Sequence, residues 1–211
     1  MKKIALFGAT GLTGKLFLEK VLKAGYTVNA LVRDPDKLVA DHSSLQLVKG
    51  SVLDLGAVKK TVENCDVVVS LFGHVKDSPE WLQTDGTRYI TQAMKQFNVV
   101  RIISLSGGGL PFPEKDKPKL MDKLIRSIMK IAVPNILNDA IQHHVVLQES
   151  GLDWVIVRAP RLTNDPPKGR YRIGWVGVNS STTISRSDLA DFLTTQLEDE
   201  NFNHQMPFVS Y

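Results

Sequence analysis

Three glycines near the start of the chain, Gly8, Gly11 and Gly14, have the spacing G-x-x-G-x-x-G and could bring the backbone close to a phosphate group. Glycine has no β-carbon, so Gly8 can form a tight turn, Gly11 can lie against a pyrophosphate and Gly14 can pack closely on a strand. The first N–H groups of a helix that begins here would have no internal partner and would point toward bound phosphates. These residues predict the binding of a dinucleotide.

The segments on either side of the glycines fit this chemistry. Lys3–Phe7 is a short apolar run, which is typical of a buried parallel strand. An amphipathic helix is expected after the glycines, with Leu18 and Leu22 on its inner face and Lys15 and Lys23 on its outer face. Strand, turn and helix together form the first half of a dinucleotide-binding unit.

The glycines have two other interpretations, and the residue that follows them tests the first. Ala9 to Lys15 nearly matches the G-x-x-x-x-G-K core of a nucleoside-triphosphate P-loop, but that motif needs Ser or Thr next, to hold magnesium. The next residue is Leu16, which argues against the P-loop. A glycine turn inside an unrelated α/β protein stays open as the plainer alternative.

Arg33 follows the second predicted strand, Thr27–Val32, about twenty residues beyond the glycine turn. In a dinucleotide-binding fold this position faces the adenine ribose, where an acidic residue binds the 2′-hydroxyl of NAD and an arginine accommodates the 2′-phosphate of NADP. A guanidinium can bind phosphate through two hydrogen bonds, and Lys37 could assist. Asp34 leaves NAD open, as does a surface role for the arginine. The sequence favours NADP(H) over NAD(H).

A further run of apolar residues, Val67–Ser70, predicts another buried strand. Ligands in open α/β sheets bind outside the carboxyl ends of the strands. We therefore expect Leu71, Phe72 and Gly73 to pass along the adenine and ribose side of the cofactor. His74 comes next and is expected to face solvent.

Arg101–Leu105 predicts the fifth strand, and Ser106 follows it, before a glycine triplet. In the nicotinamide half of such a fold this strand end lies next to the reactive ring. Ser106 could therefore donate a hydrogen bond to a substrate carbonyl or to the nicotinamide carboxamide. A serine that merely begins a glycine loop is an equally good interpretation.

Asp153–Val157 predicts the sixth strand, and Pro160 and Arg161 leave its carboxyl end, where they are expected beside the nicotinamide. Two segments rich in proline and glycine, residues 107–119 and 160–183, are expected to be substrate loops. We expect the first of them to act as a mobile flap.

The other predicted elements complete an alternation of strands and helices, which is typical of a doubly wound parallel sheet between helix layers. The remaining strands are expected at Leu45–Lys49 and Met206–Val209. The remaining helices are expected at Ala57–Glu63, Trp81–Gln96, Leu120–Ile131, about Asn138–Ser150, and from a Ser185 cap with Asp188 to about Glu198.

Length and composition set the broad class. The 211 residues suit one α/β domain over 1–211, and a formal charge of +4 does not argue for nucleic acid. Neither a signal pattern nor an apolar run of spanning length is seen, so we expect a cytoplasmic protein with no membrane partner. The one cysteine, Cys65, cannot form an internal disulfide. The basic run from Lys115 to Lys130 is mixed with Glu114, Asp116 and Asp122, and we expect a solvated loop and helix face.

The chain resembles the atypical short-chain dehydrogenases/reductases of the NAD(P)H-binding, NmrA-like group, and within it the NADPH-dependent flavin and biliverdin reductases. The resemblance rests on segments such as KKIALFGATGLTG, AGYTVNALVRD, TVENCDVVV, LQESGLDWVIVRAP and ISRSDLADF. It implies a Rossmann domain in which Thr10 to Thr13 hold the pyrophosphate. The expected cofactor-binding residues are Gly8, Thr10, Gly11, Leu12, Thr13, Gly14, Arg33, Leu71, Phe72, Gly73, Ser104, Leu105, Ser106 and Pro160. No metal site is expected.

The chain also departs from the group. Short-chain dehydrogenases generally use a Tyr-x-x-x-Lys pair for proton transfer, and no tyrosine here has lysine four residues later. The flavin and biliverdin reductases usually have a histidine near the position of Arg161 and an acidic residue at the position of Ser51. This chain has neither. His143 and His144 diverge on a helix, so we expect one packed and one exposed side chain.

Three functions are compatible with these features. The first is an NADPH-dependent reductase of a flavin, quinone or similar conjugated acceptor, with Ser106 and Arg161 as catalytic residues that polarise or anchor the acceptor. The second is an NADP-binding redox sensor of the NmrA-like type without turnover. A nucleotide-sugar epimerase or dehydratase is disfavoured by the missing tyrosine–lysine pair. A monomer or a small homo-oligomer fits any of them.

Overall fold

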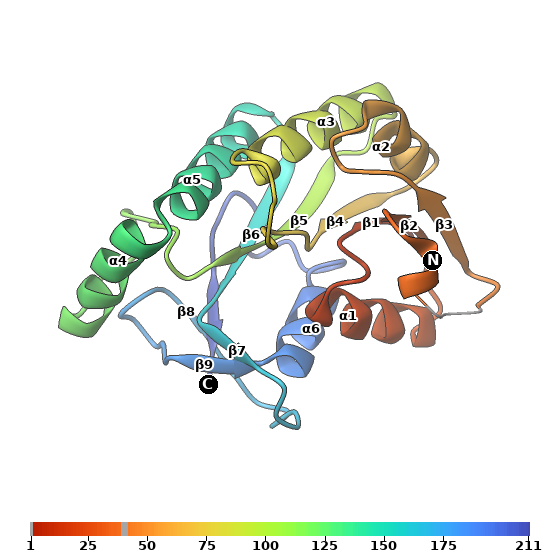
Figure 1. The fold of residues 1–211 in the computed structure, drawn as a ribbon. Helices are drawn as coiled ribbons and strands as arrows, with labels where there is room; N and C mark the ends of the chain where they lie inside the picture. The colour runs from red at the N-terminus through yellow and green to blue at the C-terminus, as the bar shows by residue number, and fades with distance from the viewer. Residues whose placement is uncertain (1, 39–41) are drawn as a thin grey trace.

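The chain folds around a largely parallel β-sheet that is covered on both faces by helices (Figure 1). The computed structural model describes residues 2–38 and 42–211. In these residues the main sheet has eight strands in the order β3-β2-β1-β4-β5-β6-β10-β8. In that order they are β3 (Leu45–Lys49), β2 (Thr27–Val32), β1 (Lys3–Phe7), β4 (Val67–Ser70), β5 (Arg101–Gly107), β6 (Asp153–Ala159), β10 (Phe208–Ser210) and β8 (Arg172–Gly174).

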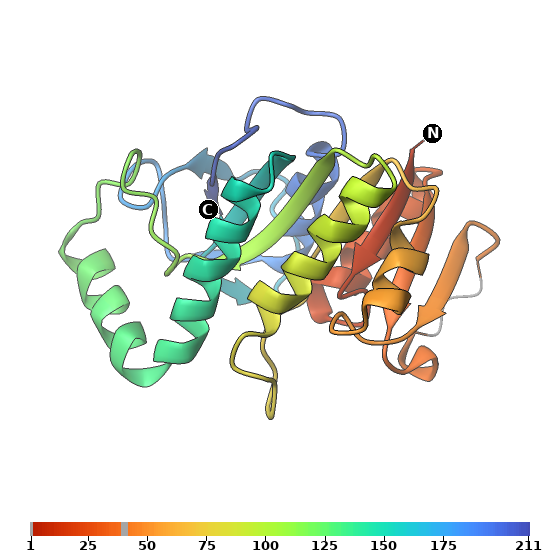
Figure 2. The same cartoon turned by 90° about the horizontal axis from the view of Figure 1, so that it is seen from above.

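Two layers of helices enclose the sheet. One face is covered by α1 (Leu12–Lys23) and α6 (Arg186–Thr195), which pack against each other (Figure 1). The other face is covered by α2 (Leu55–Val62), α3 (Leu82–Gln96) and α5 (Pro134–Glu149). Helix α4 (Leu120–Ala132) comes directly before α5 and lies at the edge of the molecule (Figure 2).

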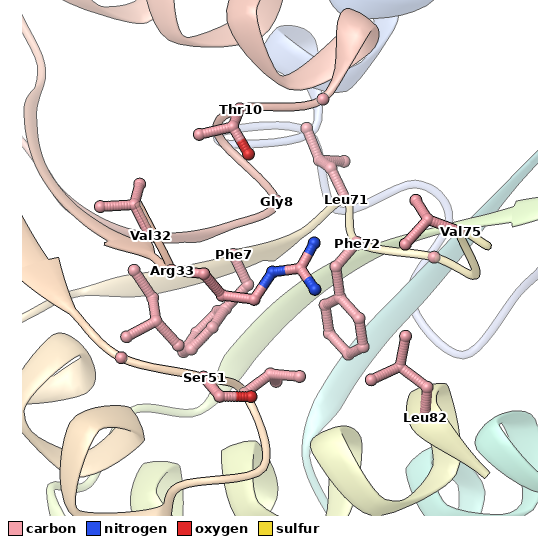
Figure 3. A pocket seen from close by; sticks show the side chains of 15 residues that line it. Phe7, Gly8, Thr10, Val32, Arg33, Ser51, Leu71, Phe72, Val75 and Leu82 are labelled. Atoms are coloured by element: carbon pink, nitrogen blue, oxygen red, sulfur yellow. The ribbon is translucent and has the colours of Figure 1, made fainter. Parts of the chain in front are cut away.

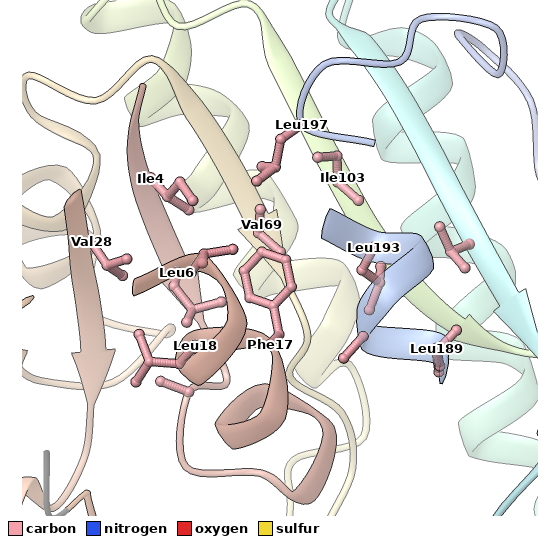
Figure 4. Packing of buried hydrophobic residues seen from close by; sticks show 14 of the residues in the cluster. Ile4, Leu6, Phe17, Leu18, Val28, Val69, Ile103, Leu189, Leu193 and Leu197 are labelled. Atoms are coloured by element: carbon pink, nitrogen blue, oxygen red, sulfur yellow. The ribbon is translucent and has the colours of Figure 1, made fainter. Parts of the chain in front are cut away.

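Apolar side chains on both faces of the strands hold these layers together, as is typical of a buried parallel sheet. On one face Phe17 of α1 and Leu193 of α6 pack with Ile4 and Val69 of the sheet (Figure 4). A second cluster on the opposite face includes Met94 of α3. Burying one such side chain is worth about 1.5–3 kcal/mol, so the two clusters fix the helices relative to the strand ends.

Strands β1 and β4 are neighbours, and the chain winds away from them in opposite directions. β1 pairs in parallel with β2 on one side and with β4 on the other. The order 3-2-1-4-5-6 is that of the Rossmann fold, so the predicted fold class is confirmed. Ligands bind such sheets where the strand order reverses, which is here the carboxyl ends of β1 and β4. The assignment of residues 1–211 to one domain stays a prediction.

The segment 160–183, which we expected to be a loop, contains regular structure, so that prediction was wrong in part. Residues Arg161–Thr163 form β7, which pairs in parallel with β9 (Thr183–Ser185) in a separate two-stranded sheet. Strand β8 pairs antiparallel with β10 at the edge of the main sheet. Strands of three residues are too short to show an alternation of apolar and polar side chains, so the sequence carried no signal for them.

Several element boundaries differ from prediction, among them the last strand, which is Phe208–Ser210 and not Met206–Val209, and three differ for local reasons. Helix α2 begins at Leu55, because the Asp54 side chain accepts hydrogen bonds from the first free amides. Helix α5 begins at Pro134, since proline is well suited to the first helical position. Strand β5 continues to Gly107, paired with β6, so Ser106 lies within the strand rather than after it.

The predicted cap of α6 is confirmed, because the Ser185 side chain accepts a hydrogen bond from the Asp188 amide. The helix itself ends at Thr195, earlier than expected. Cys65 is buried. In the described part of the chain, none of the helices has the length and apolar character needed to cross a bilayer.

Candidate functional site

The glycine turn between β1 and α1 has the geometry that its sequence predicted. Gly8 has a φ of +89°, which side chains rarely adopt, and the Gly11 amide donates to the Gly8 carbonyl oxygen at 3.1 Å. Helix α1 then begins after Gly11 with no side-chain cap and no acidic residue in its first turn. Its first amides are therefore free to bind an anion, and the helix dipole favours one.

Close backbone contacts hold this turn in place. A β-carbon on Gly14 would overlap the carbonyl oxygen of Gly8, so α1 packs directly on the end of β1. A β-carbon on Gly8 would lie 2.6 Å from the backbone of Leu71 and Phe72. The Leu71 amide in turn donates to the carbonyl oxygen of Phe7 at 2.8 Å. The glycines thus bring the ends of β1 and β4 and the start of α1 together.

A cavity of about 170 Å³ opens beside the turn, where the strand order reverses (Figure 3). It is formed by the ends of β1, β2 and β4, the segment after β3, and the start of α3. Of the residues predicted to bind a cofactor, seven line this cavity: Gly8, Thr10, Gly11, Arg33, Leu71, Phe72 and Gly73. Segments far apart in the sequence therefore meet at one place, as the sheet order requires.

Arg33 is the charged side chain of this cavity. It is exposed, and Figure 3 shows it extending from the end of β2 toward Leu71 and Phe72. No hydrogen bond or ion pair joins it to another residue in the described part of the chain. Lys37, which we expected to assist it, instead lies 3.6 Å from the Asp34 carboxylate. The guanidinium is therefore free to bind an anionic group in the cavity.

Several residues of the cavity were not singled out as site residues. Val52, Val75 and Leu82 line it together with Ser51. A β-carbon on Gly86 of α3 would lie 2.8 Å from the Phe72 ring and the Val52 side chain, so glycine there makes room for the wall of the cavity. Apolar loop residues carry no chemical signal in a sequence, which explains why they were missed.

His74 follows the cavity wall and is mostly buried, so the expectation that it faces solvent was wrong. Its Nε2 lies 2.6 Å from the Asp139 carboxylate of α5, which is completely buried. The same carboxylate accepts hydrogen bonds from the amides of Gln83 and Thr84, the first turn of α3. Asp139 therefore joins the segment after β4 to α3 and α5. It caps the start of α3 from a distant part of the chain, so the sequence around α3 does not predict this cap.

The end of β5 carries two buried serines. Ser104 Oγ lies 2.9 Å from Nε2 of His143, which is fully buried as expected for one of the histidine pair. Burial lowers the pKa of His143 to about 4, against the opposing charge of Asp139, so the imidazole is neutral. Ser106 Oγ is buried and has no hydrogen-bond partner among the described residues. A buried hydroxyl without a partner is unusual, and Ser106 directly precedes Gly107, which lines the second cavity described below.

A second cavity, of about 340 Å³, lies beyond the end of β5. Pro160 and Arg161 line it, together with apolar side chains of α4 and of the sheet edge. Its wall contains Gly107, Gly108, Gly109, Asp122, Ile125, Arg126, Met129, Ala159, Pro160, Arg161, Val176, Ser181, Thr182 and Phe208. The remaining predicted residues line neither cavity: Leu12, Thr13, Gly14, Ser104, Leu105 and Ser106.

The predicted flap, residues 107–119, is anchored at Asp116. Its carboxylate lies 2.8 Å from the guanidinium of Arg158, which is fully buried and also donates to the carbonyl oxygens of Leu110 and Met206. Arg126 of α4 lies 3.6 Å from the same carboxylate. A buried ion pair therefore holds this part of the loop to β6. The prediction of a mobile flap did not foresee this anchor.

No cluster of three or more His, Cys, Asp and Glu side chains suited to a metal ion occurs in residues 2–38 and 42–211. The residues at the two cavities offer anion binding by free amides and arginines, hydrogen bonding by serine, and apolar contact.

The sequence is similar to a family of known proteins and to two reductases. A family model described as NAD(P)H-binding matches residues 8–200. Cinnamoyl-CoA reductase 1 from Arabidopsis thaliana is 27% identical over 135 residues, which cover 58% of this chain and only 39% of the plant protein. Reductase pytE from Aspergillus terreus is 28% identical over 243 residues, covering 92% of this chain and 90% of that protein.

A solved structure shows the same fold over the whole chain. The short-chain dehydrogenase/reductase from Veillonella parvula in complex with NADP superimposes with a TM-score of 0.82 at 22% identity, covering 100% of this chain and 94% of the other.

Proposed function

Because the chain belongs to the NAD(P)H-binding family, we propose that it is an NADPH-dependent reductase that transfers hydride to a flavin, a quinone or a similar conjugated acceptor. One observation carries the proposal: an uncapped helix start, a glycine turn with no room for side chains and an arginine meet at one cavity. A protein of the same fold has been solved with NADP, which supports this choice of cofactor.

The turn after β1 would hold the pyrophosphate. The amides of Leu12, Thr13 and Gly14 belong to the first turn of α1 and have no acceptor within the helix. Since Gly8 and Gly11 present only backbone to the cavity, the diphosphate can approach these amides closely. Thr10 lines the cavity between them.

Arg33 would select the phosphorylated form of the cofactor. Its guanidinium reaches into the cavity at the end of β2, where the adenine ribose lies in this fold. A 2′-phosphate there could accept two parallel hydrogen bonds, which a 2′-hydroxyl cannot do. Asp34 lies beside Lys37 rather than lining the cavity, which favours NADPH over NADH.

The second cavity would take the acceptor. When bound, the nicotinamide supplies the hydride, and the protein positions the acceptor. Ser106 has a buried hydroxyl that is free to donate to the carboxamide or to an acceptor carbonyl. Arg161 lines the cavity beyond it and can anchor an anionic group. Apolar side chains such as Met129 and Phe208 suit a flat, conjugated ring.

The missing Tyr-x-x-x-Lys pair is compatible with this reaction. A conjugated acceptor that is reduced by hydride can take its proton from water, so no side chain has to supply one. Flavins and tetrapyrroles of the biliverdin type are acceptors of this kind, as are quinones. The reductases among the relatives support the reaction class and leave the acceptor to be found.

The test is NADPH oxidation, followed by absorbance, with a panel of flavins and quinones. We expect turnover with at least one acceptor, and a fall of about a hundredfold in kcat for Ser106→Ala. The exposed Ser127→Ala on α4 is the matched control and should keep full activity. Equal activity of Ser106→Ala and the unchanged protein would refute the role of Ser106.

A redox sensor that binds NADP without turnover is the second candidate. It is favoured by one observation, the absence of the tyrosine–lysine pair from the sequence. Tight NADPH binding with no oxidation across the whole panel would support the sensor and contradict the reductase.

A further inference from the structure

Helix α4 carries its apolar side chains on the surface of the molecule. None of its residues is buried, and Leu120 and Ile131, near its two ends, are both 84% exposed. The exposed large apolar residues of the helix are Leu120, Met121, Leu124, Ile125, Ile128 and Ile131. At about 100° per residue these six side chains fall within an arc of about 140°, so they form one continuous stripe.

Basic residues occupy the opposite side of the helix. Lys119, at the N-cap, and Lys123, Arg126 and Lys130 within the helix all lie outside the apolar stripe. Between Lys115 and Lys130 the chain has six basic and two acidic residues. One of the acidic residues, Asp116, is neutralised by the buried Arg158. The surface around α4 is therefore strongly positive as well as apolar.

The position of α4 leaves this stripe largely uncovered by the other described residues. Figure 2 shows the helix beyond α5 and clear of the sheet, to which the other helices are packed. Burying a large aliphatic side chain is worth about 1.5–3 kcal/mol, and six neighbouring ones make an exposed patch of the kind that marks an interaction surface.

We propose that α4 docks on an anionic lipid surface, with its apolar stripe at the boundary of the acyl chains and its lysines against the headgroups. A short helix with an apolar face and a basic face lies in the plane of such an interface, and binding gains from both faces. Charge complementarity selects this occupant. A second copy of this chain would bring another basic helix and no opposite charge, whereas anionic headgroups supply the charge that the basic residues of α4 lack.

The stripe continues into the second cavity. Ile125 is on its edge and Met129 lies next to it, and both line that cavity. Met129 also packs on the glycine loop, because a β-carbon on Gly109 would lie 2.6 Å from its terminal methyl group. An apolar molecule dissolved in the lipid would therefore reach this cavity along α4. Docking itself does not depend on the proposed reaction, and it can be tested without cofactor or acceptor.

The test is flotation of the whole protein with two kinds of vesicle, phosphatidylcholine alone and phosphatidylcholine mixed with phosphatidylglycerol. We expect the protein to float with the anionic vesicles and to stay behind with the neutral ones. The double variant Leu124→Gln/Ile128→Gln should bind at least about tenfold more weakly, because two side chains of the stripe are lost. Lys123→Gln/Lys130→Gln should lose at least about tenfold in affinity and much of its salt dependence.

The matched control is Val100→Gln, since Val100 is 58% exposed and lies outside α4. It should float as the unchanged protein does, and all variants should melt at the same temperature because the changed side chains are exposed. Failure of the unchanged protein to float with either vesicle overturns the proposal, as does equal flotation of the Leu124→Gln/Ile128→Gln variant. A dimer in solution that this variant dissociates would assign the stripe to a second copy and also overturn it.

Discussion

Gly14 of α1 contacts Gly8 of the turn backbone to backbone, because a β-carbon on Gly14 would overlap the carbonyl oxygen of Gly8. No rotamer can relieve such an overlap. The start of α1 can therefore lie against the end of β1 only while residue 14 is glycine. This contact sets the distance between the free helix amides and the cavity at the centre of the sheet.

Gly14→Ala should push α1 away from β1 and lower the free energy of unfolding by about 1–3 kcal/mol. The affinity for NADPH should fall as well, since the amides move from their positions. Urea titration and calorimetric binding measure the two effects. Gly73→Ala is the control for stability, because a β-carbon there would meet nothing within 4 Å. Unchanged stability of Gly14→Ala would contradict the close packing.

Asp116→Ala should lower the free energy of unfolding by about 3–5 kcal/mol, because it leaves the Arg158 charge buried without its partner. Replacing both residues with apolar ones, as Arg158→Met/Asp116→Leu, should restore much of the loss. Asp85, which is half-buried and pairs with the exposed Arg88 on α3, provides the control, and Asp85→Ala should cost less than about 1 kcal/mol. A loss as small as that of the control would show that the pair does not anchor the loop.

His143 should make the folded state less stable in acid. Burial lowers its pKa from 6.5 to about 4, so between these pH values the unfolded chain holds a proton that the folded chain does not. The free energy of unfolding therefore falls as the pH decreases through this range, by about 2 kcal/mol at pH 5.

Urea titrations at pH 7 and pH 5 measure this contribution. His143→Gln should reduce the difference between the two pH values, whatever its effect at pH 7. Gln142→Ala, on the exposed residue next to His143, should keep the original difference. An unchanged difference in His143→Gln would mean that the buried imidazole does not cause the loss.

The sequence predicted the parts of the fold that depend on local chemistry. The glycine turn, the first strands and the Ser185 cap each have a pattern within a few residues, and the structure has them where they were expected. Arg33 and Phe72 meet at one cavity because both follow strands that end at the same edge of a parallel sheet. Sequence order alone was sufficient for that inference.

The sequence did not predict contacts between residues that are far apart in the chain. The bond between His74 and Asp139 joins residues 65 positions apart, and no pattern in the sequence near either residue predicts it. Strands β7 and β9 stabilise each other although each is too short to show a pattern. The run from Lys115 to Lys130 was expected to be a solvated surface, but the 3.6-residue period places its apolar residues in one exposed stripe.

The central claim is that this chain binds a dinucleotide at the glycine turn and uses Arg33 to select the 2′-phosphate, and calorimetric titration of NADPH and NADH into Arg33→Ala tests it most directly. We expect the affinity for NADPH to fall on the order of tenfold to a hundredfold, which corresponds to about 1.5–3 kcal/mol for a charged hydrogen bond, while the affinity for NADH stays nearly unchanged. Arg88→Ala, on an exposed residue of α3, should leave both affinities as they are. Equal losses for the two cofactors, or no binding of either to the unchanged protein, would contradict the claim.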